Sequence, residues 1–195
     1  WAAGLCFFAQ MRRRAVSPDV VTFIAVASAC EKATQWRCAL WLLGEMRAVR
    51  LASNGFILSA SISACGKGLQ WRLALDLLRH GRQESLPDTV LCNAAVSACE
   101  KAGQWRPALA LLGYMVDECI PLDIVTYNAA VSACEKGHQW AWALELLSEA
   151  RRQGRVEPND ITFNAVMSAC EKGRQWEHAL ALLEEMWSRR LRPGA

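Results

Sequence analysis

A phrase of thirteen residues recurs five times along the chain, and this recurrence constrains the fold more than any other feature. The copies begin at Ile24, Ser59, Asn93, Asn128 and Asn164, and the third reads NAAVSACEKAGQW. Successive copies are therefore 34 to 36 residues apart. After each copy come an Ala-Leu pair, a Leu-Leu pair and a polar stretch that ends near Pro-Asp, Pro-Asn or a relative of them. A period of this length predicts a stack of similar supersecondary units.

We number each repeat so that its position 1 falls four residues before the recurring phrase. In this register the chain consists of the second half of a truncated repeat (1–19) and five further repeats (20–54, 55–88, 89–123, 124–159 and 160–195). The chain lacks an initiator Met and begins inside a repeat, so we expect it to be a fragment of a longer chain.

The first half of each repeat has the periodicity of a helix. Positions 4, 8 and 11 are apolar in every repeat, as in Tyr127, Val131 and Cys134, and this spacing marks one face of a helix. Positions 5, 9 and 12 form the opposite, polar stripe. We expect Thr at position 3 to be the N-cap in three repeats (Thr22, Thr126 and Thr162) and Gly at position 14 or 15 to end this helix, named helix A.

The second half of each repeat predicts a helix B that starts near the Trp at position 17. Positions 17, 20, 21 and 24 form its buried face, as in Trp140, Ala143, Leu144 and Leu147. Short amphipathic helix pairs bury their faces only by stacking, so we predict an all-α, right-handed α-solenoid of eleven helices. Positions 5, 9 and 12 should lie on its concave side. The Trp residues could be a base-stacking platform, but at helical spacing beside Ala and Leu they favour packing between repeats.

The nine cysteines do not predict a disulfide framework or a metal site. Five of them share position 11 of successive repeats (Cys30, Cys65, Cys99, Cys134 and Cys170), where stacked helices keep their backbones too far apart to bridge. No Cys-x-x-Cys pair exists, and the three His residues show no ligand spacing. We therefore expect buried thiols in a reducing compartment, with no metal and no cofactor.

No stretch has the roughly 18 uninterrupted apolar residues of a membrane span, and the N-terminus lacks the layout of a signal peptide. The sequence predicts a soluble protein with no membrane partner. Its net charge of +3 is too small to indicate a nucleic-acid binder by itself.

The repeats carry a family likeness that covers all but the last residue or so of the chain. The stretches DIVTYNAAVSACEKGHQWAWALELLSEA and NDITFNAVMSACEKGRQWEHALALLEEM resemble the pentatricopeptide repeat. The shared features are a period near 35 residues, an aromatic residue before Asn, and an ending close to Pro-Asp. Three departures are local: Trp at position 17, Ile24 at position 5, and Gly194 at the end of the last repeat.

The resemblance implies sequence-selective binding of single-stranded RNA, with one base for each repeat. It assigns the base edge to position 5 and to the last position of each repeat. The residues matched to that role are Ser59, Asp88, Asn93, Asp123, Asn128, Asn159 and Asn164. It assigns stacking on the base faces to position 2, which is Val21, Phe56, Val90, Val125 and Ile161.

The same resemblance implies base preferences. Ser59 with Asp88 looks like a pair for G, Asn93 with Asp123 like a pair for U, and Asn128 with Asn159 like a pair for C that tolerates U. The expected core is 5′-G-U-C-3′. The competing interpretation is that Asn at position 5 and Asp or Asn at the repeat end only serve helix starts and turns.

Position 13 is Lys in every repeat, and this line of cations suits a phosphate backbone. The residues are Lys32, Lys67, Lys101, Lys136 and Lys172. Five single-strand phosphate contacts would give a salt dependence of up to about 3.5 log units of affinity per log unit of salt. A Lys favoured by the negative end of helix A, and partly cancelled by Glu at position 12, is a compatible alternative.

The main rival function is a tetratricopeptide-like scaffold that binds proteins, because that class also stacks helix pairs at a 34-residue period. An enzyme is not expected, since the chain contains no His-x-Glu with Cys-x-x-Cys and no convergent carboxylate cluster. The family likeness points to RNA processing, stabilisation or expression in a mitochondrion or a chloroplast.

Overall fold

The computed structural model describes residues 1–14, 18–49, 51, 55–83, 89–153 and 156–189. These residues form eleven α-helices and no strand, which confirms the all-α prediction for this part of the chain. The helices are α1 (Ala2–Arg13), α2 (Val20–Lys32), α3 (Trp36–Ala48), α4 (Gly55–Lys67), α5 (Trp71–Gln83), α6 (Thr89–Lys101), α7 (Trp105–Asp117), α8 (Ile124–Lys136), α9 (Trp140–Gln153), α10 (Asp160–Lys172) and α11 (Trp176–Ser188). In every repeat helix A spans positions 1 to 13 and helix B begins at the Trp of position 17.

The chain divides into two compact units, which we describe separately as the N-terminal unit (Trp1–Ala98) and the C-terminal unit (Cys99–Ala195). No described helix is long and apolar enough to cross a membrane.

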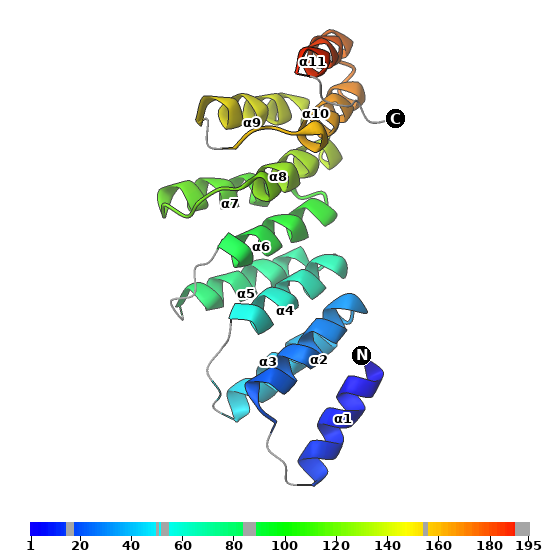
Figure 1. Ribbon diagram of the computed structural model, residues 1–195, viewed down its shortest axis with the longest axis vertical. Coiled ribbons are helices and arrows are strands. Elements are labelled where there is room, and N and C mark those ends of the chain that lie inside the picture. The colour runs from blue at the N-terminus through cyan, green and yellow to red at the C-terminus, as the bar shows by residue number, and fades with distance from the viewer. Residues whose placement is uncertain (15–17, 50, 52–54, 84–88, 154–155, 190–195) are drawn as a thin grey trace. The chain divides into compact units, whose positions relative to one another are not determined.

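The N-terminal unit is layered by contacts between successive helix pairs. Helix α2 packs against α1, α3 and α4, and α4 packs against α3 and α5 (Figure 1). The predicted apolar face of helix A is buried in α2 and α4, where positions 4, 8 and 11 are at most 2% exposed. At the start of the unit, the rings of Phe8 and Phe23 meet edge to face at 5.0 Å. Each helix A is therefore covered by the helices that precede and follow it in sequence.

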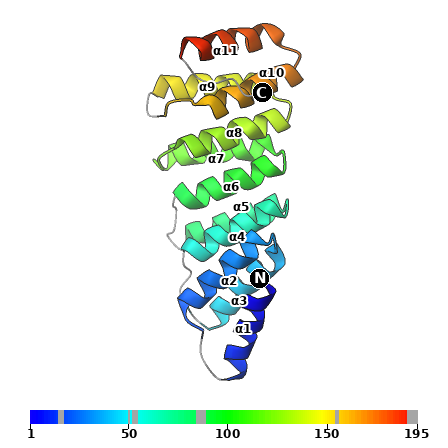
Figure 2. The ribbon, with the colours of Figure 1, turned by 45° about the vertical axis from the view of Figure 1, so that its right-hand side comes forward.

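The C-terminal unit repeats this layering. Helix α8 packs against α7, α9 and α10, and α10 packs against α9 and α11 (Figure 2). Tyr127, Val131 and Cys134 of α8 are at most 1% exposed, as are Phe163 and Cys170 of α10. The apolar stripe of helix A is the core of both units, as its periodicity predicts.

The buried face of helix B is narrower than the sequence predicts. Position 20 is fully buried in four repeats and position 24 is 6% exposed or less in the same four, as Ala143 and Leu147 show. Position 21 is half-buried in those repeats, and Leu180 at this position in the last repeat is 51% exposed. Position 17 is also half-buried or exposed. The Trp therefore lies at the edge of the core.

Three of the position-17 Trp residues pack between repeats, as predicted. A Cβ built on Gly68, Gly137 or Gly173 would lie 2.3 or 2.4 Å from the indole Cδ1 of the preceding repeat's Trp. The three indoles are those of Trp36, Trp105 and Trp140. Since real Cβ atoms do not approach so closely, position 14 is a glycine in these repeats because the indole occupies the space of a side chain.

The start of helix A differs from the prediction. The N-cap is the last residue of the preceding repeat, and the Thr at position 3 is residue N3 of the helix. Asp123 caps α8 by accepting a hydrogen bond from the Thr126 backbone N–H at 2.8 Å, and the Thr126 hydroxyl faces back to the N-cap in a capping box. The prediction of Thr as N-cap was wrong because Asp and Asn cap a helix at least as well and stand three residues earlier.

The end of helix A is built by the backbone around position 14. Position 14 is the C-cap, as at Gly137 with φ −83°, and position 15 takes a positive φ in every repeat. Four of those residues are not glycine: Thr34, Leu69, His138 and Arg174. The Gln at position 16 then donates its backbone N–H to the carbonyl of the Cys at position 11, at 2.8 to 2.9 Å. This Schellman-type backbone bond ends helix A in the same way in every repeat.

The five position-11 cysteines are buried free thiols. Burial disfavours the thiolate and raises the pKa of Cys99 to about 11 and that of Cys134 to about 12. Cys6 and Cys119 are exposed. We expect a thiol reagent at pH 8 to modify Cys6 and Cys119 in the folded protein within minutes and to reach the buried five only in denaturant, as mass spectrometry of the labelled peptides would show. Rapid native labelling of Cys134 would contradict this packing.

Candidate nucleic-acid interface

Position 2 carries an exposed apolar side chain in every repeat. Val21, Phe56, Val90, Val125 and Ile161 are between 56% and 71% exposed. Position 4, in the same helical turn, is buried in every repeat, as Tyr127 shows. Exposure at one fixed register in five repeats is not the scattered surface apolarity of an ordinary protein. The side chains predicted to stack on bases are therefore exposed at the surface, where a ligand can contact them.

An open pocket of about 350 Å³ lies on the polar face of helix A in the N-terminal unit. Phe56 and Val90, which are position 2 of successive repeats, line it together with Ser59 at position 5. The remaining lining residues are Ile24, Ser28, Glu31, Ala60, Ser63 and Ala94. This volume falls within the range of small-ligand sites. The structure thus gathers two predicted stacking residues and one predicted base-edge residue around one space.

In the C-terminal unit, position 5 meets the last position of the same repeat. The Asn128 side-chain amide donates from Nδ2 to Asn159 Oδ1 at 3.4 Å, and the Thr162 hydroxyl donates to Asn128 Oδ1 at 2.5 Å. Asn159 Oδ1 also accepts from the Thr162 backbone N–H at 3.1 Å, so Asn159 is at the same time the N-cap of α10. The predicted pair is therefore in contact, and helix capping and pairing occur together in one residue.

The other predicted base-edge residues have varied surroundings. Ser59 donates its hydroxyl to the Phe56 carbonyl at 3.0 Å. Asn93 and Asn164 are half-buried at position 5 of α6 and α10. Asp88 lies outside the described residues. Asp19, at the equivalent of the last position, caps α2, and the Thr22 hydroxyl that donates to it lowers the pKa of its carboxyl group.

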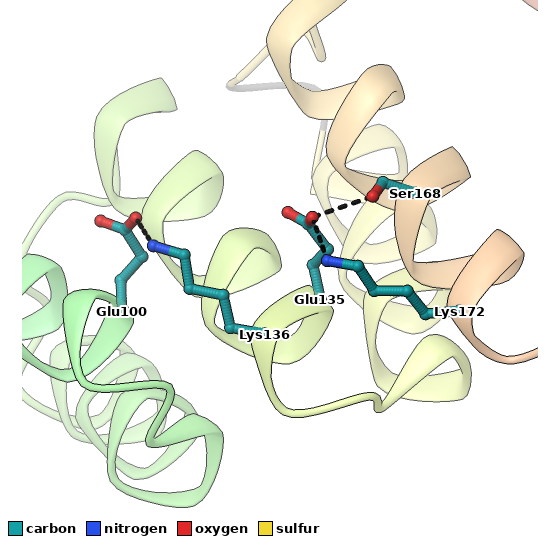
Figure 3. Close-up of polar contacts among 5 residues, drawn as sticks. All are labelled: Glu100, Glu135, Lys136, Ser168 and Lys172. Carbon is teal, nitrogen blue, oxygen red and sulfur yellow. Dashed lines mark hydrogen bonds and ion pairs between the residues drawn. The ribbon is translucent and has the colours of Figure 1, made fainter.

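A set of ion pairs between repeats is present that the sequence patterns did not predict. The Glu at position 12 pairs with the Lys at position 13 of the following repeat in Glu31–Lys67 (3.0 Å), Glu100–Lys136 (2.7 Å) and Glu135–Lys172 (2.8 Å). Figure 3 shows the last two pairs. We call these three pairs the glutamate–lysine ladder. In the sequence the Glu and the Lys of each pair are 36 or 37 residues apart. Only the stacking of repeats brings these opposite charges into contact.

Serines at position 9 donate hydrogen bonds to the glutamates of two pairs of the ladder. The Ser63 hydroxyl donates to Glu31 at 2.8 Å, and the Ser168 hydroxyl donates to Glu135 at 2.9 Å (Figure 3). The polar stripe at positions 9, 12 and 13 is therefore a network that fastens one helix A to the next. Among the described residues no group of three or more His, Cys, Asp or Glu side chains could hold a metal ion.

Comparison with family profiles assigns the repeat. A profile described as pentatricopeptide repeat domain matches residues 110–173, and one described as PPR repeat matches 90–120 and 161–191. Together these matches extend from 90 to 191, which is more than half of the chain. The chain belongs to the pentatricopeptide repeat family. The comparison with curated protein sequences found no match.

Solved structures of pentatricopeptide repeat proteins have the same fold. The crystal structure of PPR10 from maize is 30% identical to this chain, with a TM-score of 0.77 over 99% of this chain and 28% of that one. This chain therefore spans less than a third of the maize protein. PPR10 in complex with an 18-nt psaJ RNA element has 17% identity and a TM-score of 0.58, covering 98% of this chain and 33% of that one.

The PPR domain of a protein-only RNase P gives a third comparison. The PPR domain of Arabidopsis thaliana protein-only RNase P 1, solved in complex with tRNA, has 12% identity and a TM-score of 0.72. The match covers 87% of this chain and 90% of that domain. At this identity the likeness shows the shared fold alone.

Proposed function

We propose that this chain binds single-stranded RNA sequence-selectively, with one base for each repeat. The observation that carries the proposal is the pocket between Phe56 and Val90, with Ser59 on its wall. Apolar side chains of two successive repeats can cover the two faces of a base, and a polar side chain between them can bind its edge. That solved relatives hold RNA supports the same function.

The chemistry of the last position agrees with the proposed base preferences. Uracil presents an N3–H donor on its Watson–Crick edge, which a carboxylate such as that of Asp123 would accept. Cytosine presents an N3 acceptor instead, which needs a donor such as the amide nitrogen of Asn159. The Oδ1 atom of Asn159 is already used by Thr162 and Asn128, so its Nδ2 group is the one left for a ligand. We infer U for the repeat 89–123 and C for the repeat 124–159.

The test of the proposed function replaces Phe56 with Ala. Phe56 is 71% exposed, so its removal should leave the fold intact while one face of the base loses its cover. Because Val90 remains on the other side, we expect a loss of about 1 kcal/mol, or about fivefold in affinity, for RNA that contains 5′-G-U-C-3′. Fluorescence anisotropy with a labelled 12-nucleotide RNA would measure it.

The matched control is Phe7→Ala. Phe7 is 69% exposed on α1 and does not occupy position 2. An unchanged affinity in this variant would separate base stacking from a general loss of exposed aromatic surface. Equal losses in both variants, or no RNA binding by the wild type, would reject the proposed site and favour a protein-binding scaffold.

A further inference from the structure

The glutamate–lysine ladder changes which lysines can serve an RNA backbone. In each of its three pairs the Glu side chain is only 18% to 27% exposed, and the Lys side chain is 32% to 41% exposed. A partly buried carboxylate has lost some of its hydration and needs its cation. Lys67, Lys136 and Lys172 are therefore already committed to a protein anion.

The ladder also places negative charge at the proposed RNA site. Glu31 lines the pocket that contains Phe56 and Ser59, and its carboxylate is held there by Ser63 and Lys67. A phosphate that approached Lys67 would meet Glu31 in the same place. Since phosphate and carboxylate repel each other, an RNA strand and the position-12 glutamates compete for one set of lysines.

The register of the ladder is interrupted once between Glu31 and Lys172. Position 12 of the repeat 55–88 is Gly66, which has no carboxylate, and position 13 of the next repeat is Lys101. A Cβ on Gly66 would lie 2.9 Å from the Cα and Cβ of Ala98, so the helix contact inside the N-terminal unit requires glycine. Lys101 is exposed, and no carboxylate among the described residues pairs with it.

Lys32 is the second lysine outside the ladder. No carboxylate among the described residues pairs with it. Its side chain is exposed, and the neighbouring Glu31 pairs with Lys67.

We propose that Lys101, together with Lys32, makes the phosphate contacts of this chain, and that the position-12 glutamates withhold Lys67, Lys136 and Lys172 from the RNA. This assignment rests on the proposed RNA-binding function and deepens it. The ladder acts as a built-in competitor that weakens sequence-independent binding, while the bases retain their own contacts.

The assignment predicts a shallow salt dependence. Two phosphate contacts give a slope near 1.4, so affinity should fall about 7-fold between 50 and 200 mM salt. Five contacts would give a fall of about 130-fold over the same range. The two cases differ by more than a factor of ten and are easily distinguished.

The experiment measures RNA affinity against salt for the 195-residue chain and four variants. The probe is a labelled 12-nucleotide single-stranded RNA containing 5′-G-U-C-3′. Lys101→Ala removes a positive charge from an unpaired lysine. Lys136→Ala removes the same charge from a lysine of the ladder. Glu135→Gln frees Lys172, whereas Glu171→Gln removes the same charge from an exposed residue that holds no lysine in the described chain.

We expect Lys101→Ala to lower the slope to about 0.7 and Glu135→Gln to raise it to about 2.1, with little change for Lys136→Ala or Glu171→Gln. Equal effects of the two Lys variants, equal effects of the two Glu variants, or a wild-type slope near 3.5 would overturn the assignment while leaving RNA binding intact. An absence of RNA binding by the wild type at 50 mM salt would reject the proposed function and this assignment together.

Discussion

Replacing Asn159 with Asp should change the third preferred base from C to U. The substitution exchanges the Nδ2 donor for an acceptor, so the variant attracts the N3–H of uracil and repels the N3 of cytosine. One well-placed pair of hydrogen bonds to a base discriminates by about 1–3 kcal/mol, so RNA with 5′-G-U-C-3′ should bind about 5- to 150-fold more weakly. Selection from randomised RNA should then yield 5′-G-U-U-3′.

The local structure makes this a test of recognition rather than of folding. Asp123 occupies the same register and caps α8 with the hydrogen bonds that Asn159 makes in α10. An Asp at 159 should therefore cap α10 equally well, and thermal unfolding should be unchanged within about 0.5 kcal/mol.

The reciprocal variant, Asp123→Asn, is the matched control for charge. It should change the second preferred base from U to C although its charge change has the opposite sign. A purely electrostatic effect would instead strengthen or weaken all RNAs alike. If the wild type and both variants select one motif, the last position of the repeat is a helix cap and nothing more.

The helices were predictable because each is specified locally. The apolar positions 4, 8 and 11 predict helix A, and the Trp at position 17 marks the first residue of helix B. The N-cap was misassigned although its signal was present, since Asp19, Asp123 and Asn159 stand three residues before a Thr in the spacing of a capping box. The periodic pattern of apolar residues predicts where the helices lie. Which residue caps each helix depends on the side chains at its ends.

The glutamate–lysine ladder was not predicted because it is not local. Within one helix, neighbouring charges such as Glu135 and Lys136 indicate only a partial cancellation of charge. In the structure they point to different repeats, so that Glu135 pairs with Lys172 and Lys136 pairs with Glu100 (Figure 3). Pairs of this kind depend on how far one repeat rises above the next, which periodicity within a single repeat does not specify.

Alanine at both Gly137 and Gly173 should destabilise the protein by about 2–6 kcal/mol. The new Cβ atoms would lie 2.4 Å and 2.3 Å from the Cδ1 atoms of Trp105 and Trp140, so each indole must move out of its site. Overpacking of this kind costs about 1–3 kcal/mol at one site, and separate sites add approximately. Urea unfolding followed by far-UV circular dichroism would measure the free energy of unfolding.

Backbone strain does not explain this loss, and two controls show why. Gly137 has φ −83° and ψ 3°, close to the φ −90° and ψ 7° of Ala33 at the same position of another repeat. Gly113 lies within α7, where an added Cβ would meet nothing within 4 Å, so Gly113→Ala should stabilise the protein by about 0.5–1 kcal/mol. Trp105→Leu should abolish most of the cost of Gly137→Ala, because the indole that the methyl group displaces is gone. An undiminished cost in the Trp105→Leu background would show that the glycine serves the helix end and not the contact between repeats.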